Sequence, residues 1–277
     1  MIDVHPPITA VREAVARALA EDLAPLGDIT AALLPVDSDV TARLVPRQAG
    51  VLAGRMCADE AFGHIDAATK LVWEADDGQE VDAGAAVATV TGRLSSILMA
   101  ERTALNLLSH LSGVATLTRR YVRATHGQAR IRDTRKTTPG LRSLEKAAVR
   151  AGGGVNHRGN LSDGILLKDN HLAGIGIPEA VRRARLRWPG RTVEVECDDL
   201  GQVRQALDAH ADLVLLDNMS PAQVTEAVAL VDKALLVEVS GGVTLDSVRA
   251  YAEAGADLIS VGAITHSAPV LDIGLDL

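Results

Sequence analysis

The sequence predicts an α/β protein in which a small β-rich N-terminal region is followed by a parallel (β/α) barrel. From about residue 113 onward, short apolar runs alternate with helix-period segments, and this alternation indicates βαβ units around a parallel sheet. The first hundred or so residues instead carry short β-like pieces separated by turn residues. A composition of 47% hydrophobic and 23% charged residues is typical of a folded globular protein.

The balance of charged and aromatic residues excludes several classes of function. A net charge of −8, with two tryptophans, two tyrosines and one phenylalanine, argues against a nucleic-acid surface, which needs basic stripes and stacking rings. No apolar run reaches the roughly 18 residues of a membrane span, and the N-terminus lacks the pattern of a signal peptide. Cys57 and Cys197 are too few and too far apart for a disulfide framework or a zinc site. We therefore expect a cytoplasmic protein without nucleic-acid or membrane partners.

The N-terminal region opens with an amphipathic helix and continues with β-like pieces. The segments "TARLVPRQAGVLAG" and "TKLVWEADDGQEVDAGAAVATVTG" predict a small β-sandwich that serves as a scaffold. The second segment also has the rhythm of a biotinyl or lipoyl carrier domain, in which Lys70 would be the modified residue. Lys70 does not lie in a hairpin tip of the required type, so the scaffold is favoured. A long amphipathic helix, "SSILMAERTALNLLSHLSGVATLTRRYVRA", then joins the two regions and contains Arg102.

The second region contains six apolar runs, each of which closes on polar or glycine residues. They are residues 129–136, 164–170, 192–198, 213–218, 235–242 and 258–263. The steady spacing of these runs favours a (β/α) barrel over a doubly wound sheet with a switch point, which stays open as an alternative.

The carboxyl ends of these strands carry the residues that we expect to form a site. In a parallel barrel all such ends face one mouth, where ligands bind. The charged residues expected to converge there are Arg135, Lys136, Lys168, Glu196 and Asp217. Burying an isolated charge at a strand end is costly, which favours a functional role for these side chains.

Other polar residues at the same ends are explained equally well as helix caps. Asp198, Asp199 and Asn218 each stand just before a helix-period segment. The segment "SPAQVTEAVALVD" predicts a helix with Ser220 as its N-cap and Pro221 in its first turn.

The residue types at the expected mouth suit a small polyanion. Arginine forks match carboxylates and lysine supplies a point charge, while acids amid cations suggest Mg²⁺ or ribose hydroxyls next to a pyrophosphate. His157 could assist as a donor, although a lone histidine is more often structural. The glycines of "SGG" (240–242) and "GA" (262–263) are expected to leave backbone N–H groups open at helix N-termini, as a phosphate cradle.

Several motifs together resemble the quinolinate phosphoribosyltransferase family, also called carboxylating nicotinate-nucleotide pyrophosphorylase. The motifs are "AERTALNLLSHLSGVAT", "RDTRKTTPGLRSLEKAAVRAGGGVNHRGNLSDGILLKDNH", "VEVECDD", "LLDNMSP" and "SGGV". The resemblance runs from "EDLAPLGDIT" (21–30) to the C-terminus and so covers nearly the whole chain.

The resemblance implies a fold and an assembly. The fold is an N-terminal α/β sandwich domain, residues 1–112, followed by an incomplete parallel (β/α) barrel of the type II phosphoribosyltransferase kind, residues 113–265. The tail, residues 266–277, is expected to pack back on the N-terminal domain. A homodimer is implied in which each N-terminal domain covers the partner's barrel mouth, and further assembly into a hexamer stays open.

The resemblance also implies roles for individual residues. The quinolinate carboxylates are expected at Arg102 from the partner subunit, Thr134, Arg135, His157, Arg158 and Lys168. Lys136, Glu196 and Asp217 are expected to act in catalysis on 5-phosphoribosyl 1-diphosphate, with Mg²⁺ carried by its diphosphate near Glu196 and Asp217. The 5′-phosphate is expected at Ser240, Gly241, Gly242, Gly262 and Ala263. Which acid contacts the metal and which the ribose stays open.

The implied reaction is phosphoribosyl transfer to quinolinate with decarboxylation, which gives nicotinate mononucleotide, pyrophosphate and CO₂ for the synthesis of NAD. Two departures from the family pattern, Ala147 and Val239, remove no charged group. The run "LVLLDNMSP" has a single acid, so the phosphoribosyltransferase architecture with two adjacent acids is not supported. A barrel transferase acting on nicotinate and a non-catalytic phosphometabolite sensor are the alternatives.

Overall fold

The computed structural model describes residues 3–34 and 38–277, which divide into two units. The first unit consists of Met1–Arg119, Thr137–Gly153 and Ile264–Leu277. The second consists of Arg120–Lys136 and Gly154–Ala263. The loop and helix at residues 137–153 and the C-terminal segment therefore belong with the N-terminal residues.

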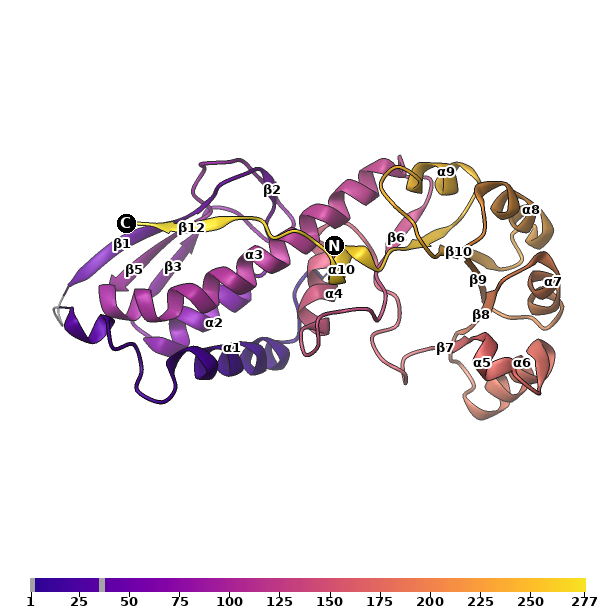
Figure 1. Cartoon of the computed structure of the whole chain (residues 1–277), viewed down its shortest axis with the longest axis horizontal. Coiled ribbons are helices and arrows are strands. Elements are labelled where there is room, and N and C mark those ends of the chain that lie inside the picture. The colour runs from indigo at the N-terminus through magenta and orange to yellow at the C-terminus, as the bar shows by residue number, and fades with distance from the viewer. Residues whose placement is uncertain (1–2, 35–37) are drawn as a thin grey trace. The chain divides into compact units, whose positions relative to one another are not determined.

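Unit 1 is built on an antiparallel sheet in the order β12-β1-β5-β3 (Figure 1). Its strands are β1 (Asp39–Pro46), β3 (Lys70–Trp73), β5 (Ala88–Arg93) and β12 (Ile273–Asp276), and a separate pair is formed by β2 (Gly50–Val51) and β4 (Glu80–Val81). Lys70 is the first residue of β3, which places it in a strand and not at the tip of a hairpin.

The helices of unit 1 form its second layer. They are α1 (Ile8–Leu23), the short 3-10 helix η1 (Ala31–Leu33), α2 (Arg55–Ile65), α4 (Arg142–Ala151) and the greater part of α3 (Leu94–Ala124). The helix α1 buries Val11, Ala14, Val15 and Leu19, a helical spacing that gives it one apolar face. The prediction of a β-sandwich was therefore wrong in one respect, because helices and not a second sheet cover the strands, as an α/β sandwich requires.

The C-terminal strand β12 extends the unit 1 sheet. It pairs antiparallel with β1, from Arg43 opposite Asp276 to Pro46 opposite Ile273. The chain approaches this strand past α3, where a Cβ on Gly113 would lie 2.1 Å from the carbonyl oxygen of Pro269. Only glycine leaves room for so close a passage.

Unit 2 is a parallel six-stranded sheet in the order β6-β11-β10-β9-β8-β7 (Figure 1). Its strands are β6 (Arg130–Arg132), β7 (Ile165–Leu167), β8 (Val193–Cys197), β9 (Leu213–Asp217), β10 (Leu236–Ser240) and β11 (Leu258–Ser260). Each lies within one of the six predicted apolar runs. Because β7 to β11 follow one another and β6 pairs with β11, the order is that of a barrel left incomplete between β6 and β7. A doubly wound order, which reverses at a switch point, is excluded.

Helices connect the strands of unit 2. They are α5 (Asp169–Leu172), α6 (Gly176–Arg187), α7 (Leu200–Asp208), α8 (Pro221–Val231), α9 (Val248–Glu253) and α10 (Ala263–His266), which begins at the edge of the unit. Ser220 caps α8 with Pro221 in its first turn, as predicted, and Asp199 caps α7 by accepting a hydrogen bond from the Gln202 N–H at 2.8 Å. None of the helices in the described ranges is long and apolar enough to cross a membrane.

Candidate active site

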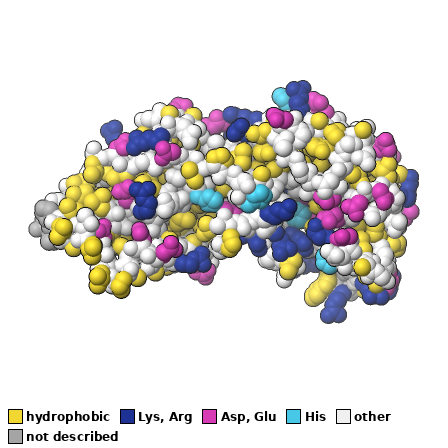
Figure 2. Space-filling model, in the orientation of Figure 1, with side chains coloured by type: hydrophobic (Ala, Val, Ile, Leu, Met, Phe, Trp, Pro, Cys, Tyr) yellow, Lys and Arg dark blue, Asp and Glu magenta, His cyan; other side chains and the backbone are white. Residues whose placement is uncertain are grey.

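A cavity of about 270 Å³ lies at the carboxyl ends of the unit 2 strands. Nine of the predicted site residues line it: Thr134, Arg135, Lys136, His157, Arg158, Lys168, Glu196, Asp217 and Ser240. In Figure 2 a group of Lys and Arg side chains is visible where Figure 1 shows the loops between β6 and β7. The barrel topology thus brings together side chains that are far apart in the sequence.

Three residues that sequence reasoning missed also line this cavity: Leu166, Leu215 and Ser260. Leu215 lies opposite Glu196 in the β8–β9 register, so it points to the same side of the sheet as that acid. Leu166 and Leu215 give the cavity an apolar surface suited to a flat ring. The sequence could have indicated the two leucines, because each lies two residues before a predicted site residue, and residues two apart on a strand share a face.

Two loops carry the cationic side of the cavity: the loop after β6, with Arg135 and Lys136, and the loop between α4 and β7, with Arg158. The hydroxyl oxygen of Thr134 accepts a hydrogen bond from the Lys136 N–H at 2.9 Å, which closes a tight turn around Arg135. Arg158 donates from its guanidinium to the Gly164 carbonyl at 3.0 Å. Burial, and after it the positive charge of Arg135, lower the pKa of Arg158. The two guanidinium groups therefore repel each other, and a bound anion would relieve that repulsion.

The acidic side of the cavity comes from β8 and β9. Glu196 forms an ion pair with Lys168, which follows β7, and its side chain is 15% exposed. Asp217 ends β9 and accepts a hydrogen bond from the Asn218 amide at 2.8 Å. Two carboxylates on neighbouring strands offer the hard oxygen ligands that Mg²⁺ prefers, and a metal held mainly by substrate phosphates needs no more from the protein.

The turn after β10 differs from the prediction. Ser240 lines the cavity, and Gly241 and Gly242 adopt positive φ angles of 92° and 59°. The helix α9 begins only at Val248, so these glycines form a turn and not a helix N-terminus. A Cβ on Gly241 would lie 2.2 Å from Asn218 Oδ1. Any larger residue would collide there, which explains why this position is a glycine.

The remaining predicted residues do not line this cavity. Gly241, Gly242 and Gly262 lie in the turns next to its wall, and Ala263 begins α10. Arg102 lies on α3 in unit 1, with a side chain that is 65% exposed and 3.4 Å from Glu101.

His157 is held by the protein at both of its ring nitrogens. Nδ1 accepts a hydrogen bond from the Arg158 N–H at 2.7 Å, and Nε2 lies 3.1 Å from Glu194 Oε2. The side chain is only 9% exposed. Its suggested use as a hydrogen-bond donor to a ligand is therefore not supported by this geometry, because the donor nitrogen already faces a carboxylate.

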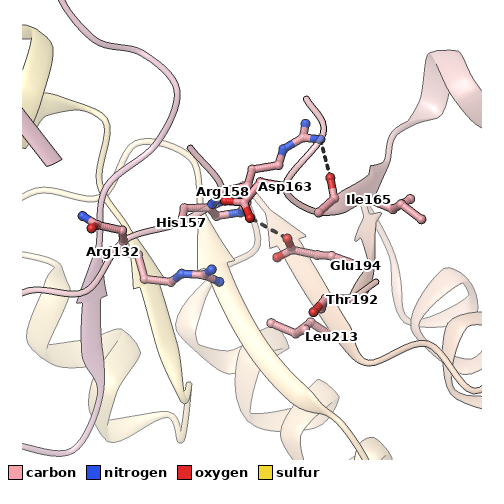
Figure 3. Close-up of a pocket in the computed structure, with 10 residues that line it drawn as sticks. Arg132, His157, Arg158, Asp163, Ile165, Thr192, Glu194 and Leu213 are labelled. Carbon is pink, nitrogen blue, oxygen red and sulfur yellow. Dashed lines mark hydrogen bonds and ion pairs between the residues drawn. The ribbon is translucent and has the colours of Figure 1, made fainter. Parts of the chain in front are cut away.

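A deeper polar layer lies below the cavity, inside the barrel (Figure 3). It borders a second cavity of about 260 Å³ that Arg132, His157, Arg158 and Glu194 help to line. Burial raises the pKa of Glu194, and burial together with the charge of Glu194 raises the pKa of Glu238 to about 7. Of these four lining residues, sequence reasoning singled out His157 and Arg158 but missed Arg132 and Glu194.

An open parallel barrel with arginines, lysines and carboxylates at one mouth defines a class: barrel enzymes that act on anionic small molecules. Comparison with known proteins specifies it further. The family models of the quinolinate phosphoribosyl transferase N-terminal and C-terminal domains match residues 28–112 and 114–276. The chain belongs to the quinolinate phosphoribosyl transferase family.

Individual relatives agree with this assignment. The nicotinate-nucleotide pyrophosphorylase [carboxylating] of Mycobacterium leprae is 45% identical and aligned over 97% of both chains. A probable enzyme of the same name from Bacillus subtilis is 42% identical over 91% of this chain and 88% of its own. The solved nicotinate-nucleotide pyrophosphorylase of Francisella tularensis superposes with a TM-score of 0.96 at 39% identity, over 100% of this chain and 99% of that one. The predicted α/β architecture is thereby confirmed.

Proposed function

We propose that this protein transfers the phosphoribosyl group of 5-phosphoribosyl 1-diphosphate to quinolinate and releases pyrophosphate and CO₂, which yields nicotinate mononucleotide for NAD synthesis. Its relatives are named for this carboxylating pyrophosphorylase activity. The observation that carries the proposal is the composition of the cavity. Arg135, Arg158 and Lys168 all line it, and the positive charge of Arg135 acts on Arg158. Such a wall is suited to a ligand with two carboxylates.

Binding of quinolinate would relieve the charge repulsion in the cationic wall. Arg135, Arg158 and Lys168 supply the positive charge, and Thr134 shapes the turn that holds Arg135. The apolar side chains of Leu166 and Leu215 would face the pyridine ring. Lys168 is paired with Glu196 before ligands bind, so a carboxylate entering the cavity would compete for that lysine.

The opposite side of the cavity would hold the phosphoribosyl donor. Glu196 and Asp217 would contact the ribose hydroxyls and oppose the positive charge that develops at ribose C1 as the diphosphate leaves. Lys136 would contact the diphosphate. Mg²⁺ carried by the diphosphate would neutralise part of the charge on the leaving pyrophosphate. The 5′-phosphate would sit at the turns of Ser240, Gly241, Gly242, Gly262 and Ala263.

Loss of CO₂ follows from the first step. Once the ring nitrogen is bonded to ribose C1, the pyridinium charge stabilises the carbanion that forms when the C2 carboxylate departs as CO₂, and this carbanion takes up a proton from solvent at C2 to give nicotinate mononucleotide. The side chains of the wall orient that carboxylate, and the apolar surface around Leu166 and Leu215 limits access of water.

The assembly and domain division belong to the same proposal. A homodimer in which Arg102 of one subunit completes the site of the other is supported by the exposure of that arginine on α3. The boundary between residues 112 and 113 is supported by the family models, which meet at this point, whereas the C-terminal model continues past residue 265 to residue 276. A cytoplasmic location is supported by Cys57 and Cys197, which are both free and buried.

Product analysis tests the proposed reaction. Purified protein with 5-phosphoribosyl 1-diphosphate and Mg²⁺ receives either quinolinate or nicotinate, and pyrophosphate and CO₂ are measured. Both products are expected in equal amounts with quinolinate alone. Pyrophosphate release with nicotinate and none with quinolinate would overturn the assignment of the cationic wall, and release with neither would overturn the transferase.

A further inference from the structure

The deep polar layer of unit 2 contains three acids or bases on different elements. Glu194 lies on β8, Glu238 on β10, and His157 on the loop between α4 and β7, and a potential ligand atom from each lies within 4.8 Å of the others. The exposed fraction of each side chain is below 10%. Figure 3 shows the His157 ring joined to Glu194 by a dashed line.

The hydrogen bonds of His157 define the state of its ring. A backbone N–H can only donate, so the 2.7 Å bond from Arg158 requires Nδ1 to be an acceptor without a proton. The remaining proton of the imidazole is then on Nε2, where it points at Glu194 Oε2, 3.1 Å away. Glu238 Oε1 is farther from the same nitrogen, at 3.7 Å.

This ring state argues against a metal ion in the layer. A metal ligand at Nε2 would need its lone pair, which would move the proton to Nδ1 and set it against the Arg158 N–H. In addition, Arg132 forms an ion pair with Glu238 and already balances that carboxylate. The three groups are better explained as a hydrogen-bonded support.

Glu194 and Glu238 differ in their other partners. Glu238 contacts Arg132 and the Ser260 hydroxyl. Glu194 contacts His157 and Glu238, and one of its oxygens, Oε1, is buried without a hydrogen-bond partner. A buried carboxylate oxygen without a partner costs stability, and proteins keep such a cost where the residue has a role.

We propose that Glu194 is a positioning residue for the quinolinate site, an inference that rests on the function proposed above. By accepting the Nε2 proton it holds the His157 ring in one tautomer, and through the Nδ1 bond that ring holds the backbone of Arg158. The guanidinium of Arg158 is thereby kept at the wall of the substrate cavity. Glu194 does not line that cavity; its charge also acts directly on Arg158 and raises the pKa of that guanidinium, and Glu194→Gln, which removes the charge but keeps the acceptor oxygen, separates this effect from the one through His157.

Steady-state kinetics of two Glu194 variants test the proposal. Glu194→Gln keeps an oxygen that can accept the Nε2 proton, whereas Glu194→Leu removes it. For Glu194→Leu we expect the KM for quinolinate to rise about tenfold, with little change in kcat. A tenfold rise is the effect of losing one of the hydrogen bonds that link Glu194 through His157 to Arg158. The KM for 5-phosphoribosyl 1-diphosphate should stay within about twofold, and Glu194→Gln should restore the KM for quinolinate.

A matched control separates positioning from general damage to the barrel. Asp212 accepts a hydrogen bond at 2.7 Å from the N–H of Val193, the neighbour of Glu194 on β8, and pairs with Arg185. Asp212→Ala should lower the melting temperature without a selective rise in the KM for quinolinate. Equal rises in both KM values for Glu194→Leu, or no rescue by glutamine, would overturn the proposal.

A spectroscopic measurement tests the ring state without reference to activity. In ¹⁵N-histidine-labelled wild-type protein, the His157 signal, assigned by loss in His157→Gln, should show a protonated Nε2 and an unprotonated Nδ1. Glu194→Gln should keep that pattern and Glu194→Leu should lose it. A protonated Nδ1 in the wild type would overturn the inference. The absence of turnover with quinolinate in a protein that shows the expected tautomer would instead overturn the proposed function.

Discussion

Arg135 and Arg158 explain at the scale of single residues why an acidic chain gathers cations after β6. Burial and the charge of Arg135 lower the pKa of Arg158. The two guanidinium groups therefore repel each other until an anion binds. The protein accepts this repulsion because the cavity is built for a charged ligand. Removing one of the two cations should therefore damage binding far more than it damages the fold.

Arg135→Ala is expected to cost at least about 3 kcal/mol in kcat/KM for quinolinate, because it takes away a bidentate partner of a carboxylate in a partly desolvated site. Steady-state kinetics measure the loss. Arg249→Ala is the control, since Arg249 pairs with Glu253 on the surface of α9 and its loss should leave kcat/KM unchanged. Near-normal turnover by Arg135→Ala would remove that residue from the site.

Glu238 gives a prediction for stability against pH. Arg132, His157, Glu194 and Ser260 surround it, and its pKa is raised from 4.5 to about 7. The folded protein therefore binds this proton more tightly than the unfolded chain does. The stability that this proton contributes is complete below about pH 4.5 and is lost as the pH rises through about 7.

Glu238→Gln has no such proton to lose. Urea unfolding between pH 5 and pH 8 should therefore show the variant gaining stability relative to the wild type as the pH rises. A difference in free energy of unfolding that stays constant across this range would mean that Glu238 titrates normally.

Single residues also show what the sequence could and could not predict. The charged residues at strand ends stood out because each closes an apolar run, and Lys168, Glu196 and Asp217 do meet in one cavity. Glu194 was missed although "VEVEC" places it two residues before Glu196 and hence on the same face. Its partner His157 comes from a loop that no periodicity places, so the contact needed the structure.

At the scale of elements, close backbone contacts determine whether a helical glycine can be replaced by a larger residue. The long helix α3 carries Gly113 where the C-terminal segment crosses it, while α2 carries Gly63, whose added Cβ would meet nothing within 4 Å. Both glycines are helical, so helix propensity alone would favour alanine at both by about 1 kcal/mol. Only the contact with Pro269 distinguishes them.

The two alanine variants form a matched pair. Gly63→Ala should raise the free energy of unfolding, whereas Gly113→Ala should lower it by about 2 kcal/mol because its Cβ collides with a backbone carbonyl. Chemical denaturation of both variants measures the difference. Stabilisation by Gly113→Ala would show that the C-terminal segment does not pass α3 as described.

The elements themselves were largely predictable. Each of the six apolar runs contains a strand, because an alternation of short apolar runs and helical segments has few other solutions than a parallel sheet. The turn after Ser240 was wrongly expected to open a helix, since glycines mark a turn without saying how many residues follow before Val248. The opening helix and the long helix of unit 1 were predicted, but local patterns do not show that such helices cover the sheet.

At the scale of the whole molecule the open question is how the site is completed. Unit 2 contains the cavity, while Arg102 lies on α3 in unit 1 with most of its side chain exposed. The proposed homodimer assigns that arginine to the partner's cavity. The family resemblance implies this assignment, whereas residue patterns alone do not, because an interface taken as a whole is about as apolar as the rest of the surface.

Mixing two inactive variants tests the shared site. Arg102→Ala and Lys136→Ala homodimers should each be inactive, and subunit exchange should restore partial activity because each mixed dimer contains one intact site. The assay follows pyrophosphate release after exchange, with exchange itself measured by mass spectrometry of the native dimers. No recovery despite complete exchange would place Arg102 in the site of its own subunit or outside the site.

The proposed activity depends on a wall of cations that holds two carboxylates. The most direct measurement is the ratio of kcat/KM for quinolinate to that for nicotinate, determined side by side with saturating 5-phosphoribosyl 1-diphosphate. A site with charges for two carboxylates leaves some of them without a partner when nicotinate binds, so the ratio should exceed about 1,000. A ratio near one would contradict the assignment of that wall.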